Sequence, residues 1–451
     1  MSRFSLRRLL TPVSVALLLS TPASHAADPP VKRVFDTWLA TFNAGNKAAL
    51  LAQGTVVGKS IGEYDNTGGV DVVAADANGS VVMAFVKAKK DGKLYRVEFL
   101  VSSDTPPLPL LVSIRPVASL PKATANGWQR VDGGADTGCA LGTPFHFYFR
   151  AGNPKKLAIH LQGGGACWNA ATCHVGEKRW FDHSVDDRDD PTFKGGVFDL
   201  TRADNPFRDY SILFIPYCTA DVHMGRRDAE YALKVEGGIE AKLKLRHNGA
   251  NNVNDALAWL NRQMPAPEAV VVMGESAGSI ASPVYAARIA THFPAARITQ
   301  LGDGSGIYRS AQVAPTALKW SLPDVLRGEA AYRSLDPAAL SHELYYILAS
   351  RHAPRIRFAQ INSAEDAVQV SFLEQLGEKN IVPTQLMKMN FADVSREVKN
   401  HRTYTIGGKE HTILFRSTFY STVVDGTPLK DWVANLIEDK EIGNVGESLL
   451  K

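Results

Sequence analysis

The sequence predicts an α/β protein with a large domain, built on a mainly parallel sheet with helices on both faces, and a smaller α+β module before it. From residue 128 onward, apolar strand-like runs alternate with amphipathic helical runs, which is typical of parallel sheets. Before residue 117, one helical run precedes several short β-branched runs that turn residues separate. The length of 451 residues also exceeds that of one average domain.

The first 26 residues have the pattern of a signal peptide. Arg3, Arg7 and Arg8 precede a short apolar run at residues 9–19, and Ser24-His25-Ala26 supplies small residues for cleavage. This run is shorter than the roughly 20 apolar residues that a membrane helix needs, and no later run approaches that length. We therefore expect export to the periplasm or the medium, and no integral membrane segment in the mature chain.

Residues 30–117 predict a helix that packs on a curved antiparallel sheet. Apolar side chains repeat with helical spacing over residues 31–42, and strand-like runs follow at residues 70–73, 81–87, 95–101 and 110–114. The arrangement resembles the cone-shaped modules of the nuclear-transport-factor-2-like (NTF2-like) class that accompany secreted bacterial hydrolases. Because no strand face gathers His, Asp and Glu, we interpret residues 30–117 as an accessory module, followed by a linker at residues 118–127.

Residues 128–451 predict the large domain. Strands are expected at residues 145–150, 157–161, 210–215, 270–273, 297–301, 355–361 and 403–406. Helices are expected at residues 253–264, with Asn252 as N-cap, directly after residue 278, and at residues 372–376 and 429–437. Reactive groups of parallel sheets collect beyond the carboxyl ends of the strands.

The segment Gly274-Glu275-Ser276-Ala277-Gly278 has the pattern Gly-x-Ser-x-Gly between a strand and a helix. This order forms the nucleophile elbow of α/β-hydrolases, in which small residues permit the sharp turn and the helix N-terminus favours developing negative charge. We interpret Ser276 as a nucleophile rather than as a chance match. Two readings of Glu275 stay open: it points to solvent, or it disfavours anionic acyl groups.

A serine nucleophile needs a base and an orienting acid, which in α/β-hydrolases follow the serine in the order acid, histidine. His411 is the predicted base because it follows a strand and a glycine-containing loop, whereas His401 is expected on the surface at the start of that strand. Asp366 is the predicted acid, just after the strand at residues 355–361. Asp303 and Glu365 are the alternatives.

Three glycines follow the strand at residues 157–161 and predict an oxyanion hole. Backbone amides of Gly163 and Gly164, together with the amide of Ala277, are the expected donors, because bulky side chains would obstruct the approach of the oxyanion. Other loops beyond strand ends carry candidate residues for the substrate pocket, with core packing as an equal alternative: Trp168, Tyr217 and His223.

Four cysteines in an exported chain predict disulfides. Of the three possible pairings we favour Cys167 with Cys173, which closes a short loop, and Cys139 with Cys218, which ties two strand ends together. The spacing lacks a second close pair and disfavours a metal site. The formal net charge of +4 is too weak and too dispersed to indicate nucleic-acid binding.

Five segments taken in order resemble the pectin acetylesterase family, which includes the Notum-type carboxylesterases. They are residues 161–173, residues 217–223, the Ser276 elbow, Asp366 with Gln369, and His411-Thr412. The resemblance covers about residues 128–440 and implies Ser276 as nucleophile, Asp366 as acid, His411 as base, the amides of Gly163, Gly164 and Ala277 as oxyanion hole, and a Cys167–Cys173 bridge. The chain departs from the family pattern at Gly165, Glu275 and Ser279, which puts the shape of the pocket in question.

The sequence therefore predicts a secreted serine esterase that works through an acyl-enzyme without metal or organic cofactor. The expected substrate is an acetylated polysaccharide or a small acyl ester. The alternatives are a lipid or long-chain acyl esterase, an amidase, and an inactive binding protein on a hydrolase scaffold. Arg226 and Arg227 offer contacts for an anionic polysaccharide, but neighbouring acidic residues favour a solvated surface. The oligomeric state stays open.

Overall fold

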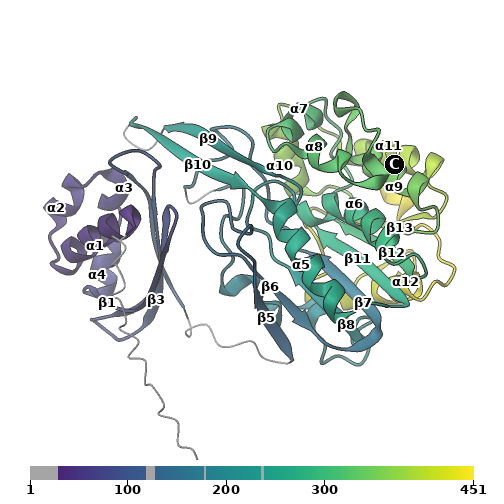
Figure 1. The fold of residues 1–451 in the computed structure, drawn as a ribbon, viewed down its shortest axis with the longest axis horizontal. Helices are drawn as coiled ribbons and strands as arrows, with labels where there is room; N and C mark the ends of the chain where they lie inside the picture. The colour runs from purple at the N-terminus through teal and green to yellow at the C-terminus, as the bar shows by residue number, and fades with distance from the viewer. Residues whose placement is uncertain (1–28, 118–126, 177–178, 235–237) are drawn as a thin grey trace, which may run out of the picture.

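The computed structural model describes residues 29–117, 127–176, 179–234 and 238–451. The predicted signal peptide at residues 1–26 and all of the predicted linker except its last residue lie outside the described residues. Figure 1 shows a small N-terminal unit beside a larger one. None of the helices in the described ranges combines the length and the apolar character that crossing a bilayer requires.

The small module has the predicted helix on an antiparallel sheet, and three further short helices. Its elements are α1 (Pro30–Asn43), α2 (Lys47–Ala52), α3 (Thr55–Gly58), α4 (Ile61–Thr67), β1 (Val70–Asn78), β2 (Val81–Ala88), β3 (Leu94–Val101) and β4 (Pro109–Pro116), with the strands in the order β1-β2-β3-β4. Helix α1 buries one apolar stripe, including Phe35 and Trp38, against the sheet. The kinship with NTF2-like modules stays a prediction.

The large domain contains an eight-stranded sheet in the order β14-β13-β12-β11-β7-β8-β6-β5. The strands are β5 (Trp128–Asp132), β6 (His146–Arg150), β7 (Asn153–Leu161), β8 (Tyr210–Ile215), β11 (Ala269–Glu275), β12 (Arg297–Asp303), β13 (Arg357–Ser363) and β14 (His401–Ile406). Strands β7, β8 and β11 to β14 run parallel, and β5 and β6 add an antiparallel edge. Every residue of β8 and β11 is buried, as a sheet covered on both faces requires. The predicted α/β-hydrolase class is confirmed.

Helices cover both faces of this sheet and form two apolar cores with it (Figure 1). The helices are α5 (Gly249–Gln263), α6 (Ala277–His292), α7 (Val313–Leu318), α8 (Leu322–Arg327), α9 (His342–His352), α10 (Ala367–Gln375), α11 (Pro383–Glu397) and α12 (Leu429–Ile437). Short 3-10 helices are η1 (Asp187–Asp189), η2 (Pro191–Phe193), η3 (Gly196–Phe198), η4 (Ala330–Tyr332), η5 (Pro337–Ala339), η6 (Ser417–Tyr420) and η7 (Glu447–Leu450), and β15 (Val423–Val424) pairs with β16 (Thr427–Pro428).

The predicted N-cap of α5 is wrong. The helix begins at Gly249, a turn before Asn252, because the side chain of Asp221 accepts a hydrogen bond from the Gly249 amide at 2.7 Å. Asn252 lies inside the helix, where its side chain exchanges two hydrogen bonds with the backbone of Gly138. A cap from a distant segment leaves no signal in the local sequence.

A hairpin of β9 (Arg227–Lys234) and β10 (Glu240–His247) was not predicted. Its apolar face, with Leu243 and Leu245, joins a cluster that also contains Leu100 and Leu111 of the small module. The Ser103 amide donates to the Lys242 carbonyl at 2.8 Å, and the Lys242 amide donates to the Asp104 side chain at 2.9 Å, which ties the hairpin to the module. Figure 1 shows the hairpin reaching from the large domain toward the module, so the two units are docked and not merely tethered.

Candidate active site

Ser276 lies at the turn between β11 and α6 with backbone angles φ 53° and ψ −117°. A positive φ is uncommon for a residue other than glycine, and such strain costs on the order of 1–3 kcal/mol and concentrates at functional sites. Side chains at the flanking glycines have no room, because a Cβ on Gly274 would meet the backbone of Gly278, and one on Gly278 would meet the backbone of Leu161. The Ser276 amide donates to the Asp303 carbonyl at 2.7 Å, which fixes the turn.

Asp366 and His411 are brought together from two loops beyond the ends of β13 and β14. Asp366 Oδ2 lies 2.7 Å from His411 Nδ1. The Asp366 carboxylate is completely buried and also accepts hydrogen bonds from the backbone amides of Val368 and Gln369 and from the Gln369 side chain, each at 3.0 Å. These bonds hold the carboxylate toward the imidazole. His411 Nε2, within the described residues, has no hydrogen-bond partner and remains available for other chemistry.

The alternative acids have other surroundings. Asp303 Oδ2 accepts the amides of Ile413 and Leu414 at 2.6 and 2.9 Å, so it holds the chain just after His411. Burial raises the pKa of Asp303 to about 7, although these two amides oppose the shift. Glu365 is exposed.

The expected surface position of His401 is wrong. Its side chain is buried, with Nδ1 2.8 Å from the Ser395 hydroxyl and Nε2 3.2 Å from the Gln360 side-chain nitrogen. Helix α11 covers the start of β14 and causes this burial, which a local reading of the sequence misses.

The glycine loop after β7 packs directly against the elbow. A Cβ on Gly163 would lie 2.8 Å from the Glu275 carbonyl and 2.9 Å from Ser276 Cβ. The Gly163 amide contributes to lowering the pKa of the Glu275 carboxyl. Gly165, at φ 77°, borders the same cavities as Ser276 and is an additional candidate donor that the sequence did not single out.

Glu275 is buried beside the nucleophile, so the reading in which it points to solvent is wrong. Its Oε2 lies 2.5 Å from Nε2 of the fully buried His160, whose ring stacks on Phe214. Burial raises the pKa of Glu275, but the adjacent His160, Lys194 and the Gly163 amide together lower it below the usual value. Glu275 also borders the outer cavity described next, and its effect on anionic acyl groups stays a prediction.

Two cavities meet at Ser276. The inner cavity, of about 90 Å³, has mostly apolar walls that include Ile280, Leu322, Phe372 and Leu376, and Ala277 lies at its edge. The outer cavity, of about 470 Å³, is more polar. Besides Ser276, it is bordered by His411, Gly163, Gly164, Arg179, Asp182 and Lys194. Ser276 therefore lies between a mainly apolar cavity and a more polar one.

Of the three residues predicted to line the pocket, Trp168 borders the inner cavity. Tyr217 and His223 do not, because both are buried beneath the glycine loop. The Tyr217 hydroxyl accepts the Val222 amide at 2.8 Å, and His223 Nε2 lies 2.7 Å from the Gln162 carbonyl. Their polar groups are used to support the loops around the site.

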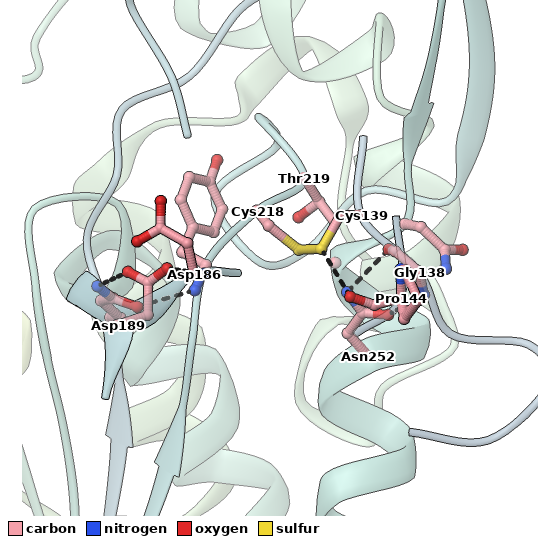
Figure 2. Close-up of a disulfide and its surroundings, with 12 residues drawn as sticks. Gly138, Cys139, Pro144, Asp186, Asp189, Cys218, Thr219 and Asn252 are labelled. Carbon is pink, nitrogen blue, oxygen red and sulfur yellow. Dashed lines mark hydrogen bonds between the residues drawn. A yellow bond between two sulfur atoms is a disulfide. The ribbon is translucent and has the colours of Figure 1, made fainter. Parts of the chain in front are cut away.

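Both predicted disulfides are formed, Cys139–Cys218 and Cys167–Cys173. Figure 2 shows the first bridge close to Gly138 and Asn252 of the large domain. The second closes the loop that follows the glycines, where the Cys167 carbonyl accepts the Trp320 indole N–H at 2.7 Å. Trp320 borders the inner cavity, so this bridge stabilises a pocket wall. In the part of the chain that the structure describes, no group of His, Cys, Asp and Glu has the arrangement of a metal site.

The family model described as Pectinacetylesterase matches residues 129–354, half of the chain. The chain belongs to the pectinacetylesterase family. Members of this family are carboxylesterases. The match includes the glycine loop and the Ser276 elbow and ends before Asp366 and His411.

A curated relative is the palmitoleoyl-protein carboxylesterase Notum of Schmidtea mediterranea, which is 33% identical over 75 residues. These residues are 16% of this chain and only 14% of the relative. Two solved structures of the Wnt deacylase Notum from Drosophila, in two crystal forms, are each 17% identical with a TM-score of 0.48. Each comparison covers 71% of this chain and 96% of the Notum chain.

Proposed function

We propose that the protein is an exported serine carboxylesterase with Ser276 as nucleophile, His411 as base and Asp366 as acid. The observation that carries the proposal is the 2.7 Å pair of Asp366 and His411 beside a cavity that the strained elbow serine also borders. Membership of the pectinacetylesterase family supports the reaction class. The signal-like N-terminus and the two disulfides support export.

In this mechanism, His411 Nε2 takes the proton of the Ser276 hydroxyl as the oxygen attacks the ester carbonyl carbon. Asp366 holds the tautomer in which Nδ1 carries hydrogen. The amides of Ala277, Gly163 and Gly164, with Gly165 as a further candidate, donate to the tetrahedral oxyanion. Collapse of the tetrahedral intermediate breaks the ester bond, and the leaving alcohol takes the proton from His411. Water then attacks the acyl-enzyme by the same steps, releasing the carboxylic acid and restoring Ser276.

The inner cavity favours an aliphatic acyl group. About 10–15 Å³ of such space holds one water molecule, so about 90 Å³ has room for several waters or for several methylene groups, which exceeds the needs of an acetyl methyl group. The outer cavity, with Arg179, Asp182 and Lys194, suits a polar alcohol such as a carbohydrate hydroxyl. We therefore favour small acyl esters of polar alcohols over long-chain esters.

The proposal is tested with a series of p-nitrophenyl esters from acetate to palmitate. Rates should peak at short chains above acetate, and Ser276→Ala should lower kcat by several powers of ten, about 10⁴- to 10⁶-fold. A fluorophosphonate probe should label the wild type and not the variant. Ser279→Ala is the matched control, since the Ser279 hydroxyl bonds Ser305 at 2.6 Å, away from the reaction.

Near-normal turnover by Ser276→Ala would disprove the assignment of the nucleophile. A wild type that neither hydrolyses any ester nor reacts with the probe would instead favour the inactive binding protein. A maximum at palmitate would favour the long-chain alternative.

A further inference from the structure

The inner cavity contains a polar side chain that the esterase mechanism does not use. His342, the first residue of α9, borders this cavity and is 2% exposed. Among the described residues, neither ring nitrogen has a hydrogen-bond partner. Buried polar groups are nearly always paired, and each exception requires an explanation.

Neighbouring side chains hold the His342 ring in place but form no hydrogen bond with its nitrogens. The His342 imidazole packs edge to face on Tyr345 and Tyr346, with ring centres 6.3 and 5.4 Å away and interplanar angles of 86°. The neighbouring Glu343 pairs with Arg309 and accepts the Asn390 side-chain amide at 3.2 Å, so its carboxylate is engaged elsewhere. A rigid imidazole therefore faces a cavity whose other walls are mainly apolar.

The imidazole is neutral at the pH of most assays. Burial lowers the pKa of His342 to about 4, although the charge of Glu343 opposes the shift. A neutral imidazole offers one N–H donor and one lone pair. A hydroxyl group is likewise both donor and acceptor, whereas a carboxylate or an ammonium group would place an unpaired charge in an apolar cavity.

We propose that His342 hydrogen-bonds a hydroxyl group on the acyl chain, and that the preferred substrates are esters of short hydroxyalkanoic acids. The inference rests on the proposed function, because it places the acyl group in the inner cavity beside Ser276. Unsubstituted chains leave the imidazole unpaired in the complex. Sites built to bond a substrate hydroxyl discriminate strongly against analogues that lack it.

The test compares p-nitrophenyl 3-hydroxybutanoate with butanoate, and 6-hydroxyhexanoate with hexanoate. For each pair, kcat/KM for the hydroxylated ester is divided by kcat/KM for the unsubstituted ester. This ratio is then divided by the ratio of the rate constants with which hydroxide hydrolyses the same two esters, which removes their difference in intrinsic reactivity. For at least one pair, the wild type should prefer the hydroxylated ester by roughly 10- to 100-fold. His342→Leu and His342→Phe should bring that ratio to about one, and the control Thr316→Val, on the same cavity wall, should leave it unchanged.

A second measurement is thermal unfolding. Because the imidazole has no partner in the fold, both apolar variants should raise the Tm, while a purely structural histidine would lower it. The inference would be overturned if the wild type showed a ratio near one for both pairs, or if both His342 variants kept the wild-type ratio. It would also be overturned if Thr316→Val lost the ratio, or if both His342 variants had a lower Tm. Absence of turnover of all four esters would contradict the esterase function itself, and the inference with it.

Discussion

At the residue scale, two buried carboxylates near His411 have different tasks. Asp366 meets the imidazole, whereas Asp303 meets the backbone that follows it. Both lie at the carboxyl ends of neighbouring parallel strands, so the sequence offered either as the acid. The two carboxylates differ in their hydrogen-bond partners, and the path of the chain after β14 determines those partners.

The variant Asp366→Asn should lower kcat by about 10³- to 10⁴-fold with a small change in KM, because an amide favours the wrong imidazole tautomer. Stopped-flow or steady-state hydrolysis of a short acyl ester measures the effect. Asp303→Asn, the matched control at the neighbouring strand end, should retain most activity. The opposite order of the two variants would transfer the acid role to Asp303.

Asp303 should also contribute to the pH dependence of stability. Its pKa in the folded protein is about 7, above the value of about 3.9 for an unfolded chain. A raised pKa means that the contribution of Asp303 to stability is complete below about pH 4 and is lost as the pH rises through 7. In thermal unfolding between pH 4 and 8, Asp303→Asn should therefore reduce the loss of Tm with rising pH. A slope identical to that of the wild type would contradict this expectation.

At the element scale, the two disulfides close loops of very different length. Cys139–Cys218 spans 79 residues and joins loops at the edge of the large sheet, whereas Cys167–Cys173 spans 6 residues beside the inner cavity. A longer closed loop removes more conformational entropy from the unfolded chain. The first bridge is therefore positioned to act on stability and the second on the site.

Replacing Cys139 and Cys218 by serine should cost about 4 kcal/mol of unfolding free energy, against about 2 kcal/mol for the corresponding pair Cys167 and Cys173. Activity should respond in the opposite order, because the Cys167 carbonyl holds Trp320 in the cavity wall. Denaturant unfolding and ester hydrolysis on both double variants measure the two effects, each variant serving as the control for the other. Equal losses of activity would show that the short loop does not shape the pocket.

At the scale of the whole molecule, buried charges connect the small module to the active-site loops. Glu98 of β3 lies 2.7 Å from His183 and 3.1 Å from Arg179 of the large domain. Burial raises the pKa of Glu98, but these partners and Arg96 bring it down to about 2. The segment at residues 179–190 continues from these contacts to the glycine loop.

Three hydrogen bonds make that connection. The Asp182 amide donates to the Gly164 carbonyl at 2.8 Å, the Ala166 amide donates to the Trp180 carbonyl at 3.0 Å, and the Gln162 side chain donates to Asp189 at 2.8 Å. These contacts link the module to the predicted oxyanion loop, and the accessory role of the module stays a prediction.

Glu98→Gln should therefore lower both stability and turnover. Removing one partner of a buried charge network costs on the order of 3–5 kcal/mol, and the displaced loop should lower kcat about 10-fold. Lys47→Ala is the control, since its ion pair with Asp65 on the same module is exposed and contributes little. If Glu98→Gln loses stability and keeps the wild-type kcat, the module stabilises the fold without positioning the site.

Much of the fold and of the candidate site was predictable, because the signals are local. Hydrophobic period distinguishes β11 from α6, and Gly-x-Ser-x-Gly between them specifies a turn that few other residues permit. The β9–β10 hairpin was also predictable, because Leu243 and Leu245 alternate with charged residues as in a half-buried strand. The many charged residues of the segment obscured this alternation. Burial of Glu275 and His401 was out of reach, because it depends on partners far along the chain.

The sequence by itself indicated the parallel sheet, the elbow at Ser276, a histidine and a choice of acids after it, and the favoured cysteine pairs, because these signals lie in local spacing and residue type. The tertiary structure alone decided which carboxylate meets His411, that Glu275 is buried beside His160, and that His342 borders the inner cavity. The physical reason is that desolvation and hydrogen bonding act on whatever groups the fold brings within a few ångströms of each other, irrespective of their separation in sequence.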